Sequence, residues 1–141
     1  AVTMGKIADI LFQRGELDEA LAMHEEYLRM AEALGDLVGI AHARYSRAQI
    51  RVARGDHERG ALPEIADDLA QAYAISRQTR RGDAIGAIGM LFAQVLAITG
   101  WQSEALAVLD EAEESFAKLG WSGRVARVQE LRSRIAGMPA R

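Results

Sequence analysis

Apolar residues recur every three or four positions along most of the chain, and short polar stretches that contain glycine interrupt them. This spacing is typical of amphipathic helices that each bury one face. The interruptions divide the chain into three helix pairs and a last single helix. We therefore predict an all-α single domain over 1–141, with helical repeats at about 3–35, 38–81 and 84–119 and a C-terminal capping helix at about 122–136.

Glycines mark the predicted helix ends at a regular spacing. Each follows the last apolar residue of a segment, where glycine accepts the positive φ that ends a helix at little cost. Successive glycines are 20, 20, 27, 18 and 20 residues apart, which describes antiparallel helices joined by short turns. The six are Gly15, Gly35, Gly55, Gly82, Gly100 and Gly120.

Small residues stand at matching positions relative to these glycines. Ala8, Ala48 and Ala93 each lie seven positions before one, and two further alanines, Ala20 and Ala105, lie five positions after one. A small residue on each helix lets two backbones approach closely, and larger side chains then interlock beside it. The expected large packing residues are Ile7, Ile10, Leu11, Phe92, Val95 and Leu96 on the first helices, and Leu17, Leu21, Leu28, Leu34, Leu106, Leu109, Phe116 and Leu119 on the second helices.

The first and third units share a residue pattern. It comprises Ile7-Ala8, Leu11, Gly15, Ala20 and Leu28 in the first unit, and Phe92-Ala93, Leu96, Gly100 and Ala105 in the third. This pattern resembles the tetratricopeptide repeat (TPR) family, in its longer variant similar to kinesin light chain and to bacterial signalling and regulator proteins. The resemblance covers roughly residues 3–120, and the second unit keeps only Ala48 and Gly55. It implies a right-handed α-solenoid of three antiparallel hairpins, whose first helices line a concave groove used for binding or scaffolding.

The second unit contains an insertion. The glycines that bound its second segment are seven residues further apart than those of the first unit. Because Pro63 fits best in the first turn of a helix, we expect a turn over 55–62 and a helix over about 63–79. One long helix kinked at Pro63 is disfavoured because Gly60 also weakens that stretch. The turn is either a plain surface loop or a loop that contacts a partner.

Four arginines share one face of the first helix predicted in the second unit. Arg44, Arg47, Arg51 and Arg54 follow helical spacing, and two of them replace the large apolar residues of the other units. Isolated buried arginine is costly, so these side chains must pair with carboxylates, bury only their stems or face the groove. Two hypotheses remain: structural ion pairs, or a strip that binds an anion or acidic peptide. The available carboxylates are Glu19, Glu25, Glu26, Glu32, Asp67 and Asp68.

The resemblance to the TPR family also places further residues in the groove, between the packing positions of the first helices. Aromatic residues there supply contact area and amides can hydrogen-bond a peptide backbone, although each residue is alternatively a partly buried packing residue. TPR domains that clamp peptide carboxylates use Lys, Arg and Asn at comparable places, so such a clamp is not expected here. The candidate groove residues are Asp9, Phe12, Gln13, His42, Tyr45, Gln49, Val52, Met90, Gln94 and Ala97.

The last predicted helix, over 122–136, has an apolar stripe with arginines outside it. A terminal helix needs a polar outer face because nothing stacks on it. Its arginines are either solvated or dock on the acidic helix at 104–114 or on an acidic partner. The stripe is Val125, Val128, Leu131 and Ile135, and the arginines are Arg124, Arg127, Arg132 and Arg134.

No pattern typical of a catalytic or metal site is found. His24-Glu25 begins like a zinc-protease motif, but Leu28 stands where the second histidine should be. His24, His42 and His57 do not approach ligand spacing of one another on one helix. We therefore expect no enzyme, no metal site and no cofactor.

Two further glycines lie inside the first helix predicted in the third unit. Gly86 and Gly89 follow Gly82, but no strand precedes them, so a dinucleotide-binding loop is not expected. They either allow close contact between two helices or lower the local stability.

Composition limits the location and the partners. A net charge of −3 argues against nucleic-acid binding by the whole surface, and no apolar run approaches the ~20 residues that span a bilayer. The absence of cysteine fits a reducing cytoplasm. Because the sequence starts at Ala1 rather than Met, we expect a fragment of a longer regulator.

Two classes of function fit these observations. The first is a protein–protein interaction module that binds a peptide or helix of a partner in the groove, with an acidic partner if the arginine strip is used. The alternative is a self-associating structural scaffold built from stacked repeats. The chain is accordingly expected to be a monomer or a weak homo-oligomer, without nucleic-acid or membrane partners.

Overall fold

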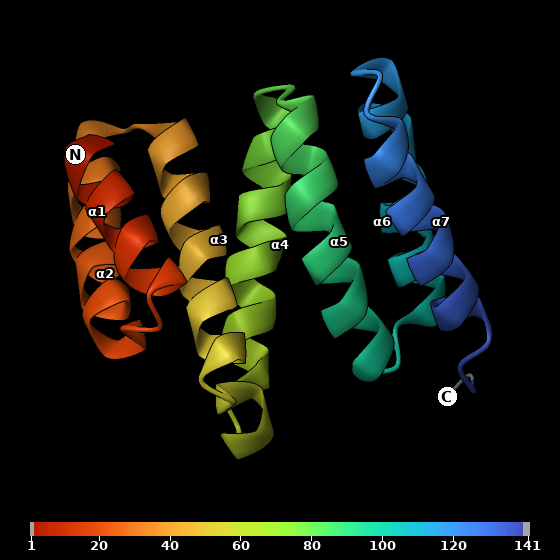
Figure 1. The fold of residues 1–141 in the computed structure, drawn as a ribbon, viewed down its shortest axis with the longest axis horizontal. Helices are drawn as coiled ribbons and strands as arrows, with labels where there is room; N and C mark the ends of the chain where they lie inside the picture. Colours follow the sequence, from red (N-terminus) through yellow and green to blue (C-terminus); the bar gives the residue numbers. More distant parts are fainter. Residues whose placement is uncertain (1, 140–141) are drawn as a thin grey trace. The chain divides into compact units, whose positions relative to one another are not determined.

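The computed structural model describes residues 2–139, which are all-α and contain no strand. Consecutive helices pack against each other within the units described below, so the predicted fold class is confirmed. In the same residues, no helix is both long enough and apolar enough to cross a membrane. Figure 1 shows α1 (Val2–Gln13), α2 (Leu17–Leu34), α3 (Leu37–Ala53), α4 (Leu62–Gln78), α5 (Gly82–Ile98), α6 (Gln102–Lys118) and α7 (Ser122–Ala136), with a short 3-10 helix, η1 (Asp56–Arg59), after α3.

The chain divides into two compact units, one ending at Ile75 and the other beginning at Ser76. The first unit holds α1, α2, α3, η1 and most of α4. In it α2 packs against both α1 and α3. The second unit holds the end of α4 with α5, α6 and α7, and α6 packs against both α5 and α7. Each unit therefore buries helical pairs of the kind that the glycine spacing predicts.

Fully buried alanines set the distance between packed helices. Ala8, Ala48 and Ala93 have no exposed surface, and neither do Ala20 and Ala105. In the second unit, Ala93 and Ala105 belong to a core that also contains large, fully buried side chains from α6 and α7. This confirms the predicted register of small residues.

Four of the large residues that were expected to interlock are instead exposed. Ile7 and Ile10 on α1 are 44% and 53% exposed, and Leu34 and Leu119 are exposed at the ends of α2 and α6. The packing prediction was wrong for these four. The isoleucines lie outside the stripe through Ala8 that α1 buries. The two leucines directly precede the glycines at which the chain leaves its helix pair.

The end of α4 differs from the prediction that Gly82 closes it. Gly82 is the first residue of α5, and Arg80 takes the left-handed conformation with φ of 55°. The amides of Arg80 and Arg81 donate to the carbonyls of Arg77 and Ser76 at 3.2 and 3.0 Å, which ends α4 before any glycine. The other predicted stops all have positive φ; they are Gly15, Gly35, Gly55, Gly100 and Gly120.

Arg80→Gly should raise the free energy of unfolding by about 0.5 kcal/mol. The left-handed conformation costs a residue with a Cβ atom about 1 kcal/mol, and part of the gain is lost because glycine gives the unfolded chain more freedom. Urea unfolding followed by circular dichroism measures the change. Gly120→Ala, at φ of 74°, is the matched reverse change and should lower stability. If Arg80→Gly is less stable than the wild type, the left-handed backbone of Arg80 does not cost stability.

The insertion forms η1, between two glycines of positive φ. α4 then begins with Pro63 in its first turn, which confirms the predicted turn and the predicted start of the helix. The guanidinium of Arg54 donates to Asp56 at 2.6 Å and to Asp18 of α2 at 2.9 Å. These contacts attach the inserted turn to the rest of its unit.

Gly86 permits the close contact between α5 and α6. A Cβ atom at this position would lie far inside van der Waals distance of three ring carbons of Phe116, which is fully buried. The interpretation of Gly86 as a close helix contact is therefore confirmed.

The capping helix α7 docks on α6 through its apolar stripe and one arginine. Arg132 contacts Asp110 and Glu113 of α6, at 2.6 Å each. This is the predicted docking of an arginine on the acidic helix. Val128, Leu131 and Ile135 are buried in the same interface, with Val125 partly buried beside them.

Candidate functional site

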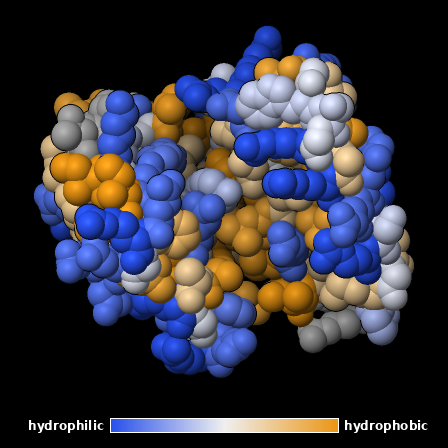
Figure 2. Space-filling view, viewed as in Figure 1, coloured by the Kyte–Doolittle hydropathy of each residue, from blue (hydrophilic) through white to orange (hydrophobic). Residues whose placement is uncertain are grey.

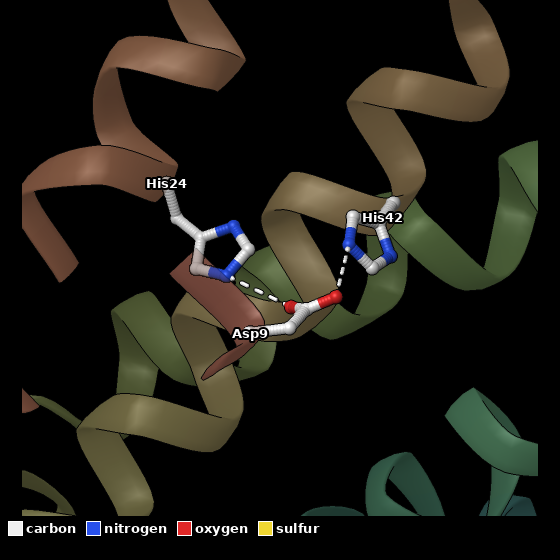
Figure 3. Close-up of side chains that lie close together, drawn as sticks. All are labelled: Asp9, His24 and His42. Atoms are coloured by element: carbon white, nitrogen blue, oxygen red, sulfur yellow. Dashed lines mark ion pairs between the residues drawn. The ribbon is translucent and has the colours of Figure 1, made fainter. Parts of the chain in front are cut away.

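Three consecutive helices of the first unit bring together a carboxylate and two imidazoles (Figure 3). Asp9 comes from α1, His24 from α2 and His42 from α3. Oδ1 of Asp9 lies 3.2 Å from Nε2 of His24, and Oδ2 lies 3.4 Å from Nε2 of His42. We refer to these three residues as the Asp–His–His cluster.

The sequence of α2 places His24 in the interior. His24 continues the helical spacing of Ala20, Tyr27, Leu28 and Ala31, which form the buried stripe of that helix. Its side chain has no exposed surface. Nε2 lies at ion-pair distance from the carboxylate of Asp9, and Nδ1 has no hydrogen-bond partner among the described residues. A buried polar group in this state costs about 1–3 kcal/mol.

Burial lowers the pKa of His24 below its ordinary value. The carboxylate of Asp9 opposes this shift, and His42 adds to it. His24 is therefore neutral near pH 7, and one ring nitrogen keeps a free lone pair. A neutral imidazole can offer this lone pair to a metal ion.

Tyr27 covers the two imidazoles from one side. Its ring is stacked on His24 with centroids 6.4 Å apart and is tilted against His42 with centroids 5.9 Å apart. Gly5 makes room for this ring, because a Cβ atom there would lie 2.5 Å from Cε2 of Tyr27. Asp9 is one helical turn after Gly5, so the close approach of α1 also holds the carboxylate beside His24.

The cluster is closed on the α2 side and open on the other. The side chain of Asp9 is 43% exposed and that of His42 is 40% exposed. Both residues are among the groove candidates. The structure therefore brings two of these candidates, from different helices, side by side on a surface shared by α1 and α3.

The other groove candidates differ in their surroundings. Gln49 donates a hydrogen bond to the hydroxyl of Tyr45 at 3.2 Å, and in the second unit Gln94 donates to the carbonyl of Met90 at 3.2 Å. Ala97 is buried in the core with α6, so its interpretation as a groove residue is wrong. Of the rest, Phe12, Tyr45, Gln49, Val52 and Met90 are partly buried, and Gln13 and Gln94 are exposed.

Three of the four arginines converge on one buried carboxylate of α4. Asp68 is 2% exposed and accepts hydrogen bonds from Nε and Nη2 of Arg47 at 2.8 and 2.7 Å. Arg44 donates to it at 3.0 Å, and Arg51 lies 3.5 Å away. The hydrogen bond to Asp68 raises the pKa of Arg47, so this guanidinium stays charged. Arg54 belongs to the separate contact with η1.

This geometry favours structural ion pairs over a strip that binds an anion. Of the carboxylates considered from the sequence, Asp68 is used most, and Glu32 lies 3.9 Å from Arg44. An open hollow of about 350 Å³ borders Arg47 and Arg51, but its wall also contains Glu64 and Asp67. These carboxylates oppose an anion in that hollow.

The sequence could not reveal the Asp–His–His cluster, because each residue lies on a different helix. No spacing within one helix relates His24 to His42, and Asp9 precedes both. The available signal was a histidine in an otherwise apolar buried stripe. Finding its neighbours requires the register of three helices.

Comparisons of the chain with protein-family models, with curated proteins and with solved structures each find no match. The fold and the site define an all-α protein of paired helices with a partly buried Asp–His–His cluster in its first unit.

Proposed function

We propose that the chain is a TPR-like protein–protein interaction module, without enzymatic activity, that binds a peptide or helix of a partner on the surface shared by α1 and α3. One observation carries this proposal. The repeat register of the sequence predicts that Asp9 and His42 both line the groove. On that surface, Oδ2 of Asp9 lies 3.4 Å from Nε2 of His42, and about two fifths of each side chain is exposed.

The surrounding side chains suit a peptide. Phe12, Tyr45 and Val52 are partly buried and offer apolar area, and Gln13 and Gln49 carry amides that can pair with a peptide backbone. Rigid aromatic side chains with polar neighbours are common among the residues that contribute most to binding.

The second unit supports the same class of function by itself. Met90, Gln94 and Ile98 are four residues apart and therefore share one face of α5. Ile98 is 49% exposed, and Figure 2 shows hydrophobic residues gathered over the C-terminal half of α5. Exposed apolar area of this kind is typical of an interaction surface.

A displayed library of random peptides tests the proposal. We expect selection on the wild-type chain to enrich peptides whose affinity, measured by fluorescence polarisation, falls at least ~10-fold in Phe12→Ala and Gln49→Ala variants. Glu26→Ala is the matched control, because Glu26 lies on an exposed part of α2 and pairs with Arg29 of the same helix.

Equal binding by all three variants would contradict the proposed surface, provided that circular dichroism shows the same helix content. Failure to enrich any peptide with wild-type protein would contradict peptide recognition as the function. The variants leave the Asp–His–His cluster intact, so the result depends on the surface alone.

Self-association is the second candidate, favoured by Ile7 and Ile10. Both are exposed on α1, and Figure 2 shows a small hydrophobic area over this helix. In the repeat register they correspond to the packing residues Phe92 and Val95 of the third unit. Light scattering at increasing concentration separates the candidates: a constant monomer mass supports the peptide-binding module, and a rising mass that Ile10→Glu abolishes supports the scaffold.

A further inference from the structure

We propose that the Asp–His–His cluster is a zinc-binding site, with Asp9, His24 and His42 as its three protein ligands and water in the fourth position. This inference does not depend on the peptide-binding function. It rests on the arrangement of the three side chains and on the full burial of a histidine whose neighbouring metal-ligating groups among the described residues are the other two members of the cluster.

The distances fit a tetrahedral ion. Zinc binds nitrogen and oxygen at about 2.0–2.2 Å, so neighbouring ligand atoms in a tetrahedral site are about 3.3–3.5 Å apart. Oδ1 of Asp9 lies 3.2 Å from Nε2 of His24, and Oδ2 of the same carboxylate lies 3.4 Å from Nε2 of His42, so a rotation of this half-exposed carboxylate would bring one oxygen to both imidazoles. One ligand atom of each of the three residues lies within 4.8 Å of the other two. The half-exposed His42 side chain has room for the small movement that closes this arrangement.

His24 supplies the second, independent observation. Its side chain is fully buried, yet neither ring nitrogen has a hydrogen-bond partner within the described residues. Buried polar atoms without partners are rare and call for an explanation such as an ion. Figure 3 shows the His24 ring directed at the same carboxylate that faces His42. A zinc ion between the three groups would take the lone pair of Nε2 of His24 and would be neutralised in part by the carboxylate of Asp9.

The donor set selects the type of metal. Two imidazole nitrogens and one carboxylate oxygen suit zinc and related transition metals, whereas Mg²⁺ and Ca²⁺ prefer oxygen ligands alone. Three protein ligands with an open side leave one coordination position for water. Here the open side is the surface where Asp9 and His42 are about two fifths exposed.

Zinc bound at this place would connect all three helices of the N-terminal part of the first unit. Because the site does not exist in the unfolded chain, binding should stabilise the folded state. Unfolding of the first unit should therefore shift with zinc concentration.

Calorimetric titration of tag-free, chelator-treated protein with zinc chloride tests the proposal. We expect one zinc ion per chain, and affinity at least ~10-fold weaker in His42→Gln and in Asp9→Asn. Both side chains are partly exposed, so these variants should fold. His57→Gln is the matched control, because His57 lies on η1 outside the cluster and should be dispensable for zinc.

Two further readouts make the test decisive. Zinc should raise the thermal unfolding midpoint of the wild type and of His57→Gln but not of His42→Gln, and Co²⁺ should give the visible absorption of a tetrahedral site. The absence of zinc binding by the wild type would overturn the proposal. Equal zinc affinity in His42→Gln and His57→Gln would overturn it too, since the ion would then bind elsewhere. Phe12→Ala should keep its zinc, which separates this test from that of the peptide surface.

Discussion

Asp68→Asn should lower the free energy of unfolding by about 3 kcal/mol or more. The carboxylate of Asp68 is 2% exposed and is contacted by Arg44, Arg47 and Arg51, each of which is itself mostly buried. Removing this negative charge leaves three guanidiniums close together without the buried carboxylate that they share. Breaking a buried ion pair from one side is far more destabilising than losing a surface pair. Urea unfolding followed by circular dichroism measures the loss.

The neighbouring residue provides the control. Asp67 is exposed, and its carboxylate accepts one hydrogen bond from Gln71 at 2.9 Å. Asp67→Asn removes the same negative charge from the same turn of α4. We expect it to change the free energy of unfolding by no more than about 0.5 kcal/mol. Equal stability of the two variants would show that the cluster around Asp68 does not hold the first unit together.

Arg47→Leu distinguishes the two hypotheses for the arginines. If the arginines form structural ion pairs, this variant loses stability and keeps the affinity for selected peptides, because its guanidinium is used by Asp68. A loss of peptide binding in a fully folded Arg47→Leu protein would instead favour the strip that binds acidic partners.

Gly86→Ala should destabilise the second unit by about 2–3 kcal/mol. The new methyl group would overlap three ring carbons of Phe116, which is fully buried in the core shared by α5, α6 and α7. Helix propensity alone favours alanine over glycine by about 1 kcal/mol, so the steric term must exceed this gain. Thermal unfolding monitored by circular dichroism measures the effect.

Two variants make this prediction specific. Gly123→Ala in α7 is the same change at a helical glycine whose Cβ position has no neighbouring atom within 4 Å among the described residues, and it should be neutral or slightly stabilising. Phe116→Leu removes the ring that Gly86→Ala would meet. The double variant should therefore lose less stability than the two single losses added together. Additive losses would show that the ring is not the obstacle.

Local features explain why the helices were predictable. Helix periodicity and helix-ending glycines depend on residues within a few positions of one another, and the alanines repeat at fixed distances from those glycines. Ala8, Ala48 and Ala93 are accordingly buried as predicted. The prediction failed at Gly82, because Arg80, two residues earlier, takes the left-handed conformation that follows the end of α4.

The burial of individual large side chains was harder to predict. Ile7, Ile10 and Leu34 have the spacing of packing residues, yet they are exposed. Periodicity shows which residues share a helix face, but it does not show whether another helix covers that face. The neighbours of the helix decide this.

The sequence by itself therefore determined the helices of this protein, their approximate ends and the alanines at which they approach closely. The tertiary structure alone decided that Asp68 receives three arginines and that Asp9, His24 and His42 meet. Helix formation is governed by short-range backbone hydrogen bonds and side-chain spacing. Contacts between residues on different helices depend on the axial and rotational register of those helices, which is settled only when their side chains pack together.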